Sequence, residues 1–304
     1  FIALRGDPAD PLQQAVSPVI GKLKRAYSND PATVVRYAET FIQAHHEAGV
    51  LTALKHWPGH GLATGDTHLG LVDVTQTAQP IEQWPFQQLI RSGSADAVMT
   101  AHLVNRSVDP DWPVTLSQSF IQPLLRARDG FDGVVVTDDL HMGAIQLQHT
   151  PREAVVRAIR AGNDLLVLSN NPGAATRVPG FQPRYDMGRH VASLVREAIA
   201  NGELTEADID TAWRPQHRGL QRRQQDAARH LGRNVALLAQ LDHAVRLQLG
   251  HHRIHVLSPQ AVSAQARRHA QAFKECARAL DGGADTRLFV PLAQAPHTLG
   301  VLQQ

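Results

Sequence analysis

The stretch "GVVVTDDLHM" (residues 133–142) joins a run of β-branched residues to two adjacent carboxylates, Asp138 and Asp139. Val and Thr are enriched in strands because a branched Cβ packs well on a pleated surface. A short, continuous apolar run is typical of a strand covered on both faces, as in a parallel sheet. We therefore predict a buried strand over 133–137 that ends at the two carboxylates.

Three further runs follow the same pattern, namely "GVLTAL" (49–54), "AVMTA" (97–101) and "DLLVLS" (164–169). Each leads directly into polar residues, which are Lys55-His56, His102 and Asn170-Asn171. Helical spacing fills the intervals, so the chain is α/β with a parallel sheet. Polar groups after several strands are typical of barrel enzymes. This favours a (β/α)8 TIM-type barrel, although the spacing also allows an open, doubly wound sheet.

Helix boundaries are marked by short signals. Residues 31–48 have an amphipathic pattern, with Asp30 as a predicted N-cap and Gly49 as a predicted end. The sequence "TPRE" (150–153) is a capping box, and Gly162 ends the helix that follows it. These signals predict helices on both sides of the strand at 133–137.

Two later features are less regular. Ser117 is a predicted N-cap, but Pro123 lies inside the helix that would follow, so we expect a kink or a late start. Beyond the last strand we expect a loop and then helices over 187–201 and 204–213. We assign residues 1–213 to the barrel domain.

Residues 214–304 form a predicted C-terminal extension of helical or mixed structure. Its first part, 214–250, is rich in Arg, Gln and His and is predicted to be an exposed helix. The expected remainder is "RIHVL" (253–257) and "TRLFVPL" (286–292) as strands on either side of a helix over 259–280.

Composition excludes several classes of protein. The net charge is +2, which gives no general electrostatic reason to expect nucleic acid or a membrane surface as a partner. The single cysteine, Cys276, excludes an internal disulfide and a cysteine-based metal cluster. No apolar run reaches the roughly 18 residues of a membrane span. We expect a cytoplasmic monomer, with export left open because the first residue is Phe and the N-terminus is expected to be incomplete.

The stretch "KHWPGHGLATGDTH" (55–68) carries the densest group of titratable residues, separated by glycines. Asp66 and His68 are two residues apart in what must be a loop, where the carboxylate can reach the imidazole. Such a contact fixes the tautomer and raises the basicity of the ring, leaving the other nitrogen for proton transfer. Lys55 and His56 could hold hydroxyl or carbonyl groups of a substrate, and the glycines would let the loop move.

A metal site is the alternative interpretation of this stretch. His56, His60, Asp66 and His68 could in principle bind zinc, but they lack a spacing that presents them to one ion. His60 by itself is better explained as a structural histidine that bonds backbone. We therefore predict no metal.

The two carboxylates should not share a direction, because side chains alternate along a strand. One of Asp138 and Asp139 can face the barrel mouth while the other caps a helix or bonds backbone. A carboxylate and a histidine on facing strand ends would provide a nucleophile and a proton donor, which suits glycoside cleavage by double displacement.

The long motif resembles the signature of glycoside hydrolase family 3, in its β-N-acetylglucosaminidase branch. That signature is Lys-His-Phe-Pro-Gly-His-Gly, a few residues, then Asp-Ser-His, so Trp57 and Thr67 are mild departures. The segments "IGKLKRAYSNDP" (20–31), "AVMTAHL" (97–103) and "GFDGVVVTDDLHMGAI" (130–145) also resemble that family. The resemblance covers about residues 18–172, with a weaker similarity to about 213.

The resemblance implies roles for particular residues. Asp138 would be the nucleophile, His68 the general acid/base and Asp66 its orienting partner. The implied sugar-binding residues are Lys55, His56, Arg25 and His102. No metal or organic cofactor is implied. The implied substrates carry a terminal β-linked N-acetylglucosamine, as in cell-wall muropeptides or chitooligosaccharides.

The chain also departs from the family pattern. Only 54 residues precede Lys55, too few for the first barrel strands and for the acidic residue that binds the far hydroxyls of the sugar. The barrel is therefore expected to be incomplete at its N-terminus. Three alternatives stay open: a degenerate barrel that binds cell-wall sugars without cutting them, a metal-dependent barrel hydrolase, and phosphate in place of water as the acceptor.

Overall fold

The structure is a computed structural model that describes residues 17–23, 25–48, 50–213, 247–249 and 252–254. Its main sheet is parallel, with strands in the order β1 (Ala53–Trp57), β3 (Ala97–Thr100), β5 (Val134–Asp139) and β6 (Leu165–Val167). A small parallel pair, β2 (Val72–Asp73) and β4 (Leu103–Val104), stands apart from this sheet. The α/β class with a parallel sheet is thus confirmed.

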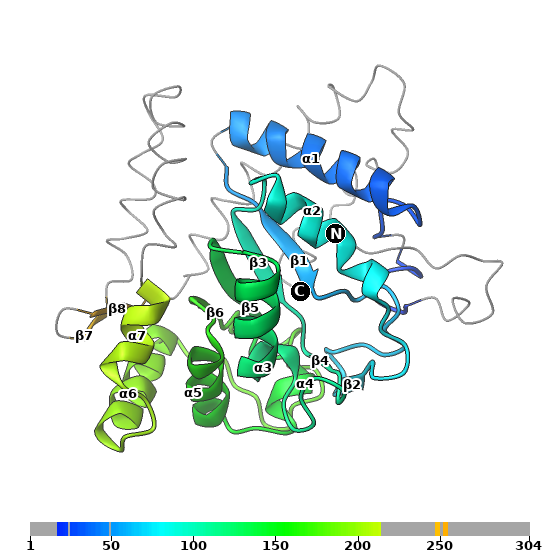
Figure 1. Cartoon of the computed structure of the whole chain (residues 1–304). Helices are drawn as coiled ribbons and strands as arrows, with labels where there is room; N and C mark the ends of the chain where they lie inside the picture. Colours follow the sequence, from blue (N-terminus) through cyan, green and yellow to red (C-terminus); the bar gives the residue numbers. More distant parts are fainter. Residues whose placement is uncertain (1–16, 24, 49, 214–246, 250–251, 255–304) are drawn as a thin grey trace.

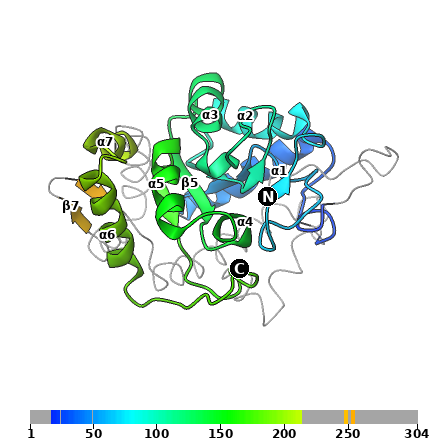
Figure 2. The same ribbon diagram turned by 90° about the horizontal axis from the view of Figure 1, so that it is seen from below.

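The helices alternate with the strands along the chain. The longer ones are α1 (Pro31–Glu47), α2 (Trp84–Arg91), η3 (Ile121–Arg128), α5 (Pro151–Ala161), α6 (Met187–Ala200) and α7 (Glu206–Trp213). The shorter ones are η1 (Pro80–Glu82), η2 (Val114–Leu116), α3 (Gln118–Phe120) and α4 (Gly143–Gln146). In both overall views α5 lies between the sheet and the pair formed by α6 and α7 (Figures 1 and 2).

The expected barrel is not closed by the described residues. Their main sheet has four strands, with β1 and β6 at its edges. About eight strands are needed before a sheet can curl into a barrel whose interior side chains fill. The described sheet is therefore an open, parallel one, and the closed (β/α)8 form is not present in this part of the chain.

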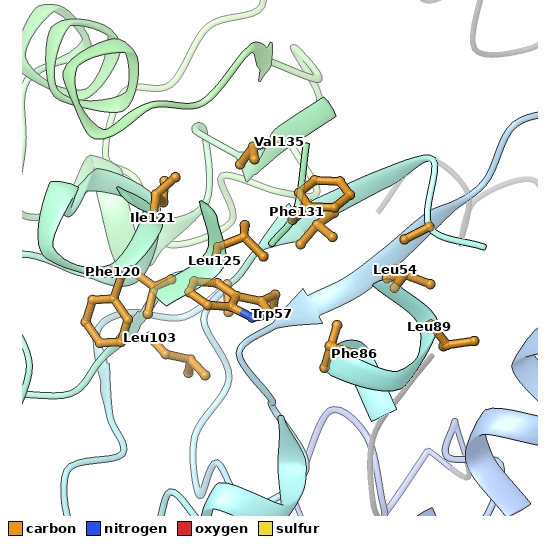
Figure 3. Packing of buried hydrophobic residues seen from close by; sticks show 14 of the residues in the cluster. Leu54, Trp57, Phe86, Leu89, Leu103, Phe120, Ile121, Leu125, Phe131 and Val135 are labelled. Atoms are coloured by element: carbon orange, nitrogen blue, oxygen red, sulfur yellow. The ribbon is translucent and has the colours of Figure 1, made fainter. Parts of the chain in front are cut away.

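One face of the sheet is covered by helices. Leu54 and Trp57 of β1 lie in one buried cluster with Phe86 and Leu89 of α2 (Figure 3). Helix α1 packs beside α2 (Figure 1). A second cluster joins α5 and α6 to Leu166 of β6. Burying an apolar side chain of this size contributes about 1.5–3 kcal/mol, so these two clusters are what hold the strands in register.

Two buried aspartates fasten the N-terminal end of the sheet. Asp96 precedes β3 and accepts hydrogen bonds from the backbone of Thr52 at 2.9 Å and from its hydroxyl at 3.1 Å. Asp164 precedes β6 and accepts from the backbone of Val135 at 2.8 Å and from Arg126 at 2.7 Å. Each aspartate therefore ties the start of its own strand to a neighbouring strand.

Two predicted helix starts are confirmed. The Asp30 carboxylate accepts from the backbone of Thr33 at 2.8 Å, and the Thr150 hydroxyl accepts from the backbone of Glu153 at 3.2 Å. The second helix ends at Gly162, whose φ of 103° lies in the left-handed region that favours glycine.

Ser117 occupies the N-cap position of α3 as predicted, but its hydroxyl donates to Asp109 and makes no capping hydrogen bond. Pro123 lies within η3, which is π-helical. Proline removes a backbone donor, and π-helical turns are one way in which a chain accommodates that loss. The irregularity predicted from Pro123 is therefore confirmed.

Several strand boundaries differ from the prediction. The strand predicted over 49–54 begins only at Ala53, and the strand predicted over 164–169 spans Leu165–Val167. Lys55 and His56 lie inside β1, and Asp138 and Asp139 lie inside β5, so these residues belong to the strands themselves. A strand whose end forms part of a site can finish in polar residues, and apolar periodicity alone does not show where such a strand ends.

In the predicted extension, residues 247–249 form strand β7, which pairs with β8 (His252–Ile254) in antiparallel fashion. The prediction of one helix over 214–250 is wrong at these residues. The predicted strand "RIHVL" (253–257) is confirmed at residues 253–254, which belong to β8, and its other residues lie outside the described ones. The remaining expectations for 214–304 also lie outside the described residues. Among the helices that the structure describes, none has the length and apolar character that a membrane crossing would require.

Candidate active site

Asp138 is the centre of the site. Nε2 of His56 lies 3.3 Å from Oδ2 of Asp138, and the backbone N–H of Asp139 donates to Oδ1 at 2.8 Å. Burial by itself raises the pKa of Asp138, but His56, His102 and Lys55 together outweigh it and hold the pKa well below its ordinary value. Asp138 is therefore a carboxylate at any pH near neutrality.

The two irregular places of the sheet lie at these residues. Lys55 pairs with Met99 and Trp57 pairs with Thr100, so His56 is an extra residue in β1. The register between β5 and β6 also shifts between Val136 and Asp139, next to Asp138. Bulges change the direction of a side chain relative to its neighbours. They explain how Lys55 and His56, adjacent in sequence, both act on Asp138.

The basic groups beside Asp138 are themselves partly buried. Burial lowers the pKa of Lys55 and, more strongly, that of His56, while the charge of Asp138 opposes both shifts. His56 therefore faces Asp138 as a neutral imidazole near neutral pH. A neutral imidazole can donate one hydrogen bond to a carboxylate or to a sugar hydroxyl.

Asp66 and His68 form the contact that the sequence led us to expect. Nδ1 of His68 lies 2.8 Å from Oδ1 of Asp66, which also accepts the backbone N–H of His68 at 2.9 Å. A carboxylate can only accept, so Nδ1 carries the proton and Nε2 is the nitrogen left for chemistry. Both side chains are 29% exposed, so this nitrogen can meet a ligand.

The loop that carries this pair rests on the start of α4. The backbone N–H of Gly143 donates to the carbonyl of His68 at 3.2 Å, and that of Ala144 donates to the carbonyl of Thr67 at 3.0 Å. The loop is therefore docked against the segment that follows Asp138. Its expected mobility stays a prediction.

Arg25 connects the two halves of the site. Nη1 donates to the carbonyl of Val19 at 3.0 Å. Burial lowers the pKa of its guanidinium, and the charges of Asp138 and Asp66 oppose that shift. One cation is thus close to both carboxylates, and the structure brings Arg25 together with Lys55 and His56 as predicted.

His102 is brought to the site in a different way. Its ring is fully buried, with Nε2 donating to the carbonyl of Asp139 at 2.9 Å and Nδ1 at 2.9 Å from the hydroxyl of Thr115. Burial lowers its pKa, while Asp138 and the carbonyl of Asp139 oppose that shift. Both ring nitrogens are therefore engaged by protein atoms.

Asp139 points away from Asp138, as expected of neighbours in a strand. Its Oδ1 accepts from the backbone N–H groups of His141 at 3.0 Å and Ser169 at 3.1 Å.

Within the described residues, no three side chains of the His, Cys, Asp or Glu type gather where a metal ion could be held. His60 is 4% exposed, and its ring meets that of His56 edge-on at 5.8 Å between centroids.

Glu82 is a further residue of this region that the sequence did not indicate. It is 5% exposed, and its carboxylate accepts from the backbone of Leu62 at 3.1 Å and from that of Gln79 at 3.3 Å. Burial raises its pKa. The partner loop lies 20 residues earlier in the chain, so no local pattern marks the contact.

Comparison with known proteins finds related sequences. Residues 14–215 match the family model "Glycosyl hydrolase family 3 N terminal domain". A β-hexosaminidase of Tolumonas auensis is 36% identical over 170 residues, which is 55% of this chain and 50% of that protein. The chain spans about half the length of the curated relatives it matches.

Solved structures show the same relationship. A β-N-acetylhexosaminidase from Beutenbergia cavernae is 31% identical with a TM-score of 0.58, covering 73% of this chain and 60% of its own. A family 3 β-N-acetylglucosaminidase from a Paenibacillus species is 26% identical with a TM-score of 0.58, covering 90% of this chain and 45% of its own. The family model alone covers well over half of the residues, and the chain therefore belongs to glycosyl hydrolase family 3.

Proposed function

We propose that the protein is a retaining exo-β-N-acetylglucosaminidase, in which Asp138 is the nucleophile and His68 the general acid/base. The observation that carries this proposal is the pairing of an ionised carboxylate, 18% exposed, with a nearby Asp66–His68 dyad. Relatives named β-hexosaminidase support the class of substrate. The substrate would carry a terminal β-linked N-acetylglucosamine, as in cell-wall muropeptides or chitooligosaccharides.

In the first step a carboxylate oxygen of Asp138 attacks the anomeric carbon, and the bond from that carbon to the leaving oxygen breaks. Nε2 of His68 gives its proton to the leaving oxygen. In the second step water attacks the same carbon, passes a proton back to His68, and releases the Asp138 carboxylate. Two displacements on one carbon retain its configuration.

Asp66 serves this cycle by holding His68 in one tautomer and by stabilising the imidazolium form. Lys55, His56 and Arg25 supply donors around Asp138 for the hydroxyls and the acetamido group of the sugar. Both ring nitrogens of His102 are engaged by protein atoms. We therefore assign His102 the role of orienting β5, the strand that carries the nucleophile.

The first experiment measures release of nitrophenol from an aryl β-N-acetylglucosaminide. Turnover by the parent should fall by about a thousandfold or more in Asp138→Asn, because removing one essential group costs that much in covalent catalysis. His68→Ala should lose less on this activated substrate, and added azide should restore part of its turnover. A fluorinated N-acetylglucosaminyl fluoride should label the peptide that contains Asp138, as seen by mass spectrometry.

Other outcomes point to the alternatives. A folded parent that binds N-acetylglucosamine without turnover would make the chain a sugar-binding protein. Activity lost on chelation and restored by zinc would favour metal-dependent hydrolysis. Formation of the sugar 1-phosphate in phosphate buffer would replace water by phosphate as the acceptor.

A further inference from the structure

We propose that the start of α4, Gly143 and Ala144, positions the acid/base of the reaction by clamping the backbone of the His68 loop. This inference rests on the proposed function and adds positioning residues to it. It is drawn from a close approach of two backbones, which fixes a distance between the nucleophile strand and the proton donor.

The clamp consists of two backbone hydrogen bonds in succession. Gly143 N–H reaches the carbonyl of His68 at 3.2 Å, and Ala144 N–H reaches the carbonyl of Thr67 at 3.0 Å. Thr67, between the dyad residues, is 3% exposed. Two successive bonds fix both the position and the orientation of the turn, because a single bond would let it pivot.

Position 143 requires glycine because there is no room for a Cβ atom. A Cβ there would lie 2.5 Å from the carbonyl oxygen of His68 and 3.2 Å from the carbonyl carbon of Leu69. The obstacle is backbone, which cannot rotate away as a side chain can. Any larger residue at 143 must therefore push the loop outward.

The clamp links the two catalytic groups through a short path. Asp138 lies in β5, and Gly143 begins α4 five positions later. Between them, the N–H of Leu140 bonds the carbonyl of Val167 at 3.0 Å and that of Met142 bonds the carbonyl of Asp139 at 3.0 Å. The segment between Asp138 and Gly143 is therefore held by backbone hydrogen bonds, so the position of the nucleophile strand determines the position of the His68 loop.

The test compares two substrates that differ in how much acid help their leaving group needs. For Gly143→Ala we expect kcat/KM to fall about a hundredfold on a poor leaving group, such as an N-acetylglucosamine disaccharide, because a displacement near 1 Å costs about that much. On dinitrophenyl β-N-acetylglucosaminide, which needs no acid, kcat/KM should change little. Azide should raise the kcat of the variant, since it attacks without a general base.

Gly133→Ala is the matched control. A Cβ at Gly133 would lie 2.6 Å from the Phe131 ring and 2.7 Å from the carbonyl oxygen of Asp96, at the opposite end of β5. It introduces a similar clash away from the loop. It should lower the unfolding temperature and leave the ratio of kcat/KM between the two substrates unchanged.

A second variant, Ala144→Pro, removes one N–H of the clamp without adding a Cβ at position 143. Proline is tolerated in the first turn of a helix, and the preceding glycine has no Cβ for the ring to meet. It should shift the substrate ratio in the same direction as Gly143→Ala. Equal losses on both substrates in the folded variants would overturn the clamp, whereas absence of turnover in the parent would instead overturn the proposed function.

Discussion

At the scale of single residues, the state of Asp138 decides what the site can do. Desolvation acts to raise its pKa, yet Lys55 and two histidines hold that pKa below the value of about 3.9 that it has in an unfolded chain. The native state thus binds fewer protons than the unfolded state at low pH. Asp138 contributes stability above about pH 4, and that contribution is lost as the pH falls through the folded pKa.

Asp138→Asn removes this linkage and gives a prediction for stability. The difference in free energy of unfolding, parent minus variant, should stay constant from about pH 6 to about pH 5 and decrease as the pH falls from there to about 3. Urea unfolding of both proteins at several pH values measures it. Curves that stay parallel across this range would contradict an ionised Asp138 paired with cations.

Some residue contacts could be predicted from the sequence and others could not. The Asp66–His68 contact was predictable because the two residues are two positions apart in a loop, where a carboxylate can reach an imidazole. The contact between Glu82 and Leu62 was not, since it depends on how η1 packs against a loop 20 residues away. Contacts between residues close in the sequence can be predicted from it, whereas contacts between separate elements depend on the whole fold.

At the scale of elements, the strand ends show the same limit. Apolar periodicity located β1, β3, β5 and β6 but ended β1 before Lys55 and β5 before Asp138. The position of the extra residue in each of these strands depends on how the strand pairs with its neighbour. The sequence of one strand does not show the register of that pairing. The prediction therefore found the strands and missed the bulges that place their functional side chains.

Glu82 provides a prediction for η1 and the loop at 59–62. Its two oxygens accept backbone N–H groups from both segments, and a Cβ on Gly59 would lie 2.5 Å from the Cβ of Glu82. Glu82→Gln keeps the volume but sets an NH2 group against one of these donors. Leaving a buried donor unpaired costs about 1–3 kcal/mol, so the free energy of unfolding should fall by that amount.

The same substitution should weaken substrate binding, because the loop at 59–62 continues directly from Lys55 and His56. We expect a higher KM with a smaller change in kcat, measured on the aryl N-acetylglucosaminide. Ile81→Ala is a suitable control, since Ile81 is the exposed neighbour of Glu82 in η1. A normal stability and KM for Glu82→Gln would show that the loop does not depend on this carboxylate.

At the scale of the whole molecule, the two ends of the sheet have separate tasks. The C-terminal end carries Asp138 and the groups around it, while the N-terminal end is fastened by the buried side chains of Asp96 and Asp164. Parallel strands make this division possible because all their C-terminal ends lie on one side. The sequence predicted the functional end from polar residues after strands, but it gave no reason to separate Asp164 from the strand that it precedes.

Asp164→Ala tests this division. The Asp164 side chain is 2% exposed and pairs with Arg126 of η3, which is 12% exposed, while also accepting from Val135 of β5. Removing one partner of a buried ion pair leaves a charge without compensation, at about 3–5 kcal/mol. Arg126 keeps the carbonyls of Phe131 and Gly133 as acceptors, so the loss should lie near the lower limit.

The folded fraction of Asp164→Ala should nevertheless keep the kcat/KM of the parent, because the pair lies at the opposite end of the sheet from Asp138. Urea unfolding measures the loss of stability, and initial rates at a temperature well below the transition measure activity. The exposed Asp132→Ala should change neither quantity. A fall in kcat/KM for folded Asp164→Ala would mean that the N-terminal end of the sheet also sets the geometry around the nucleophile, and the separation of tasks would then be wrong.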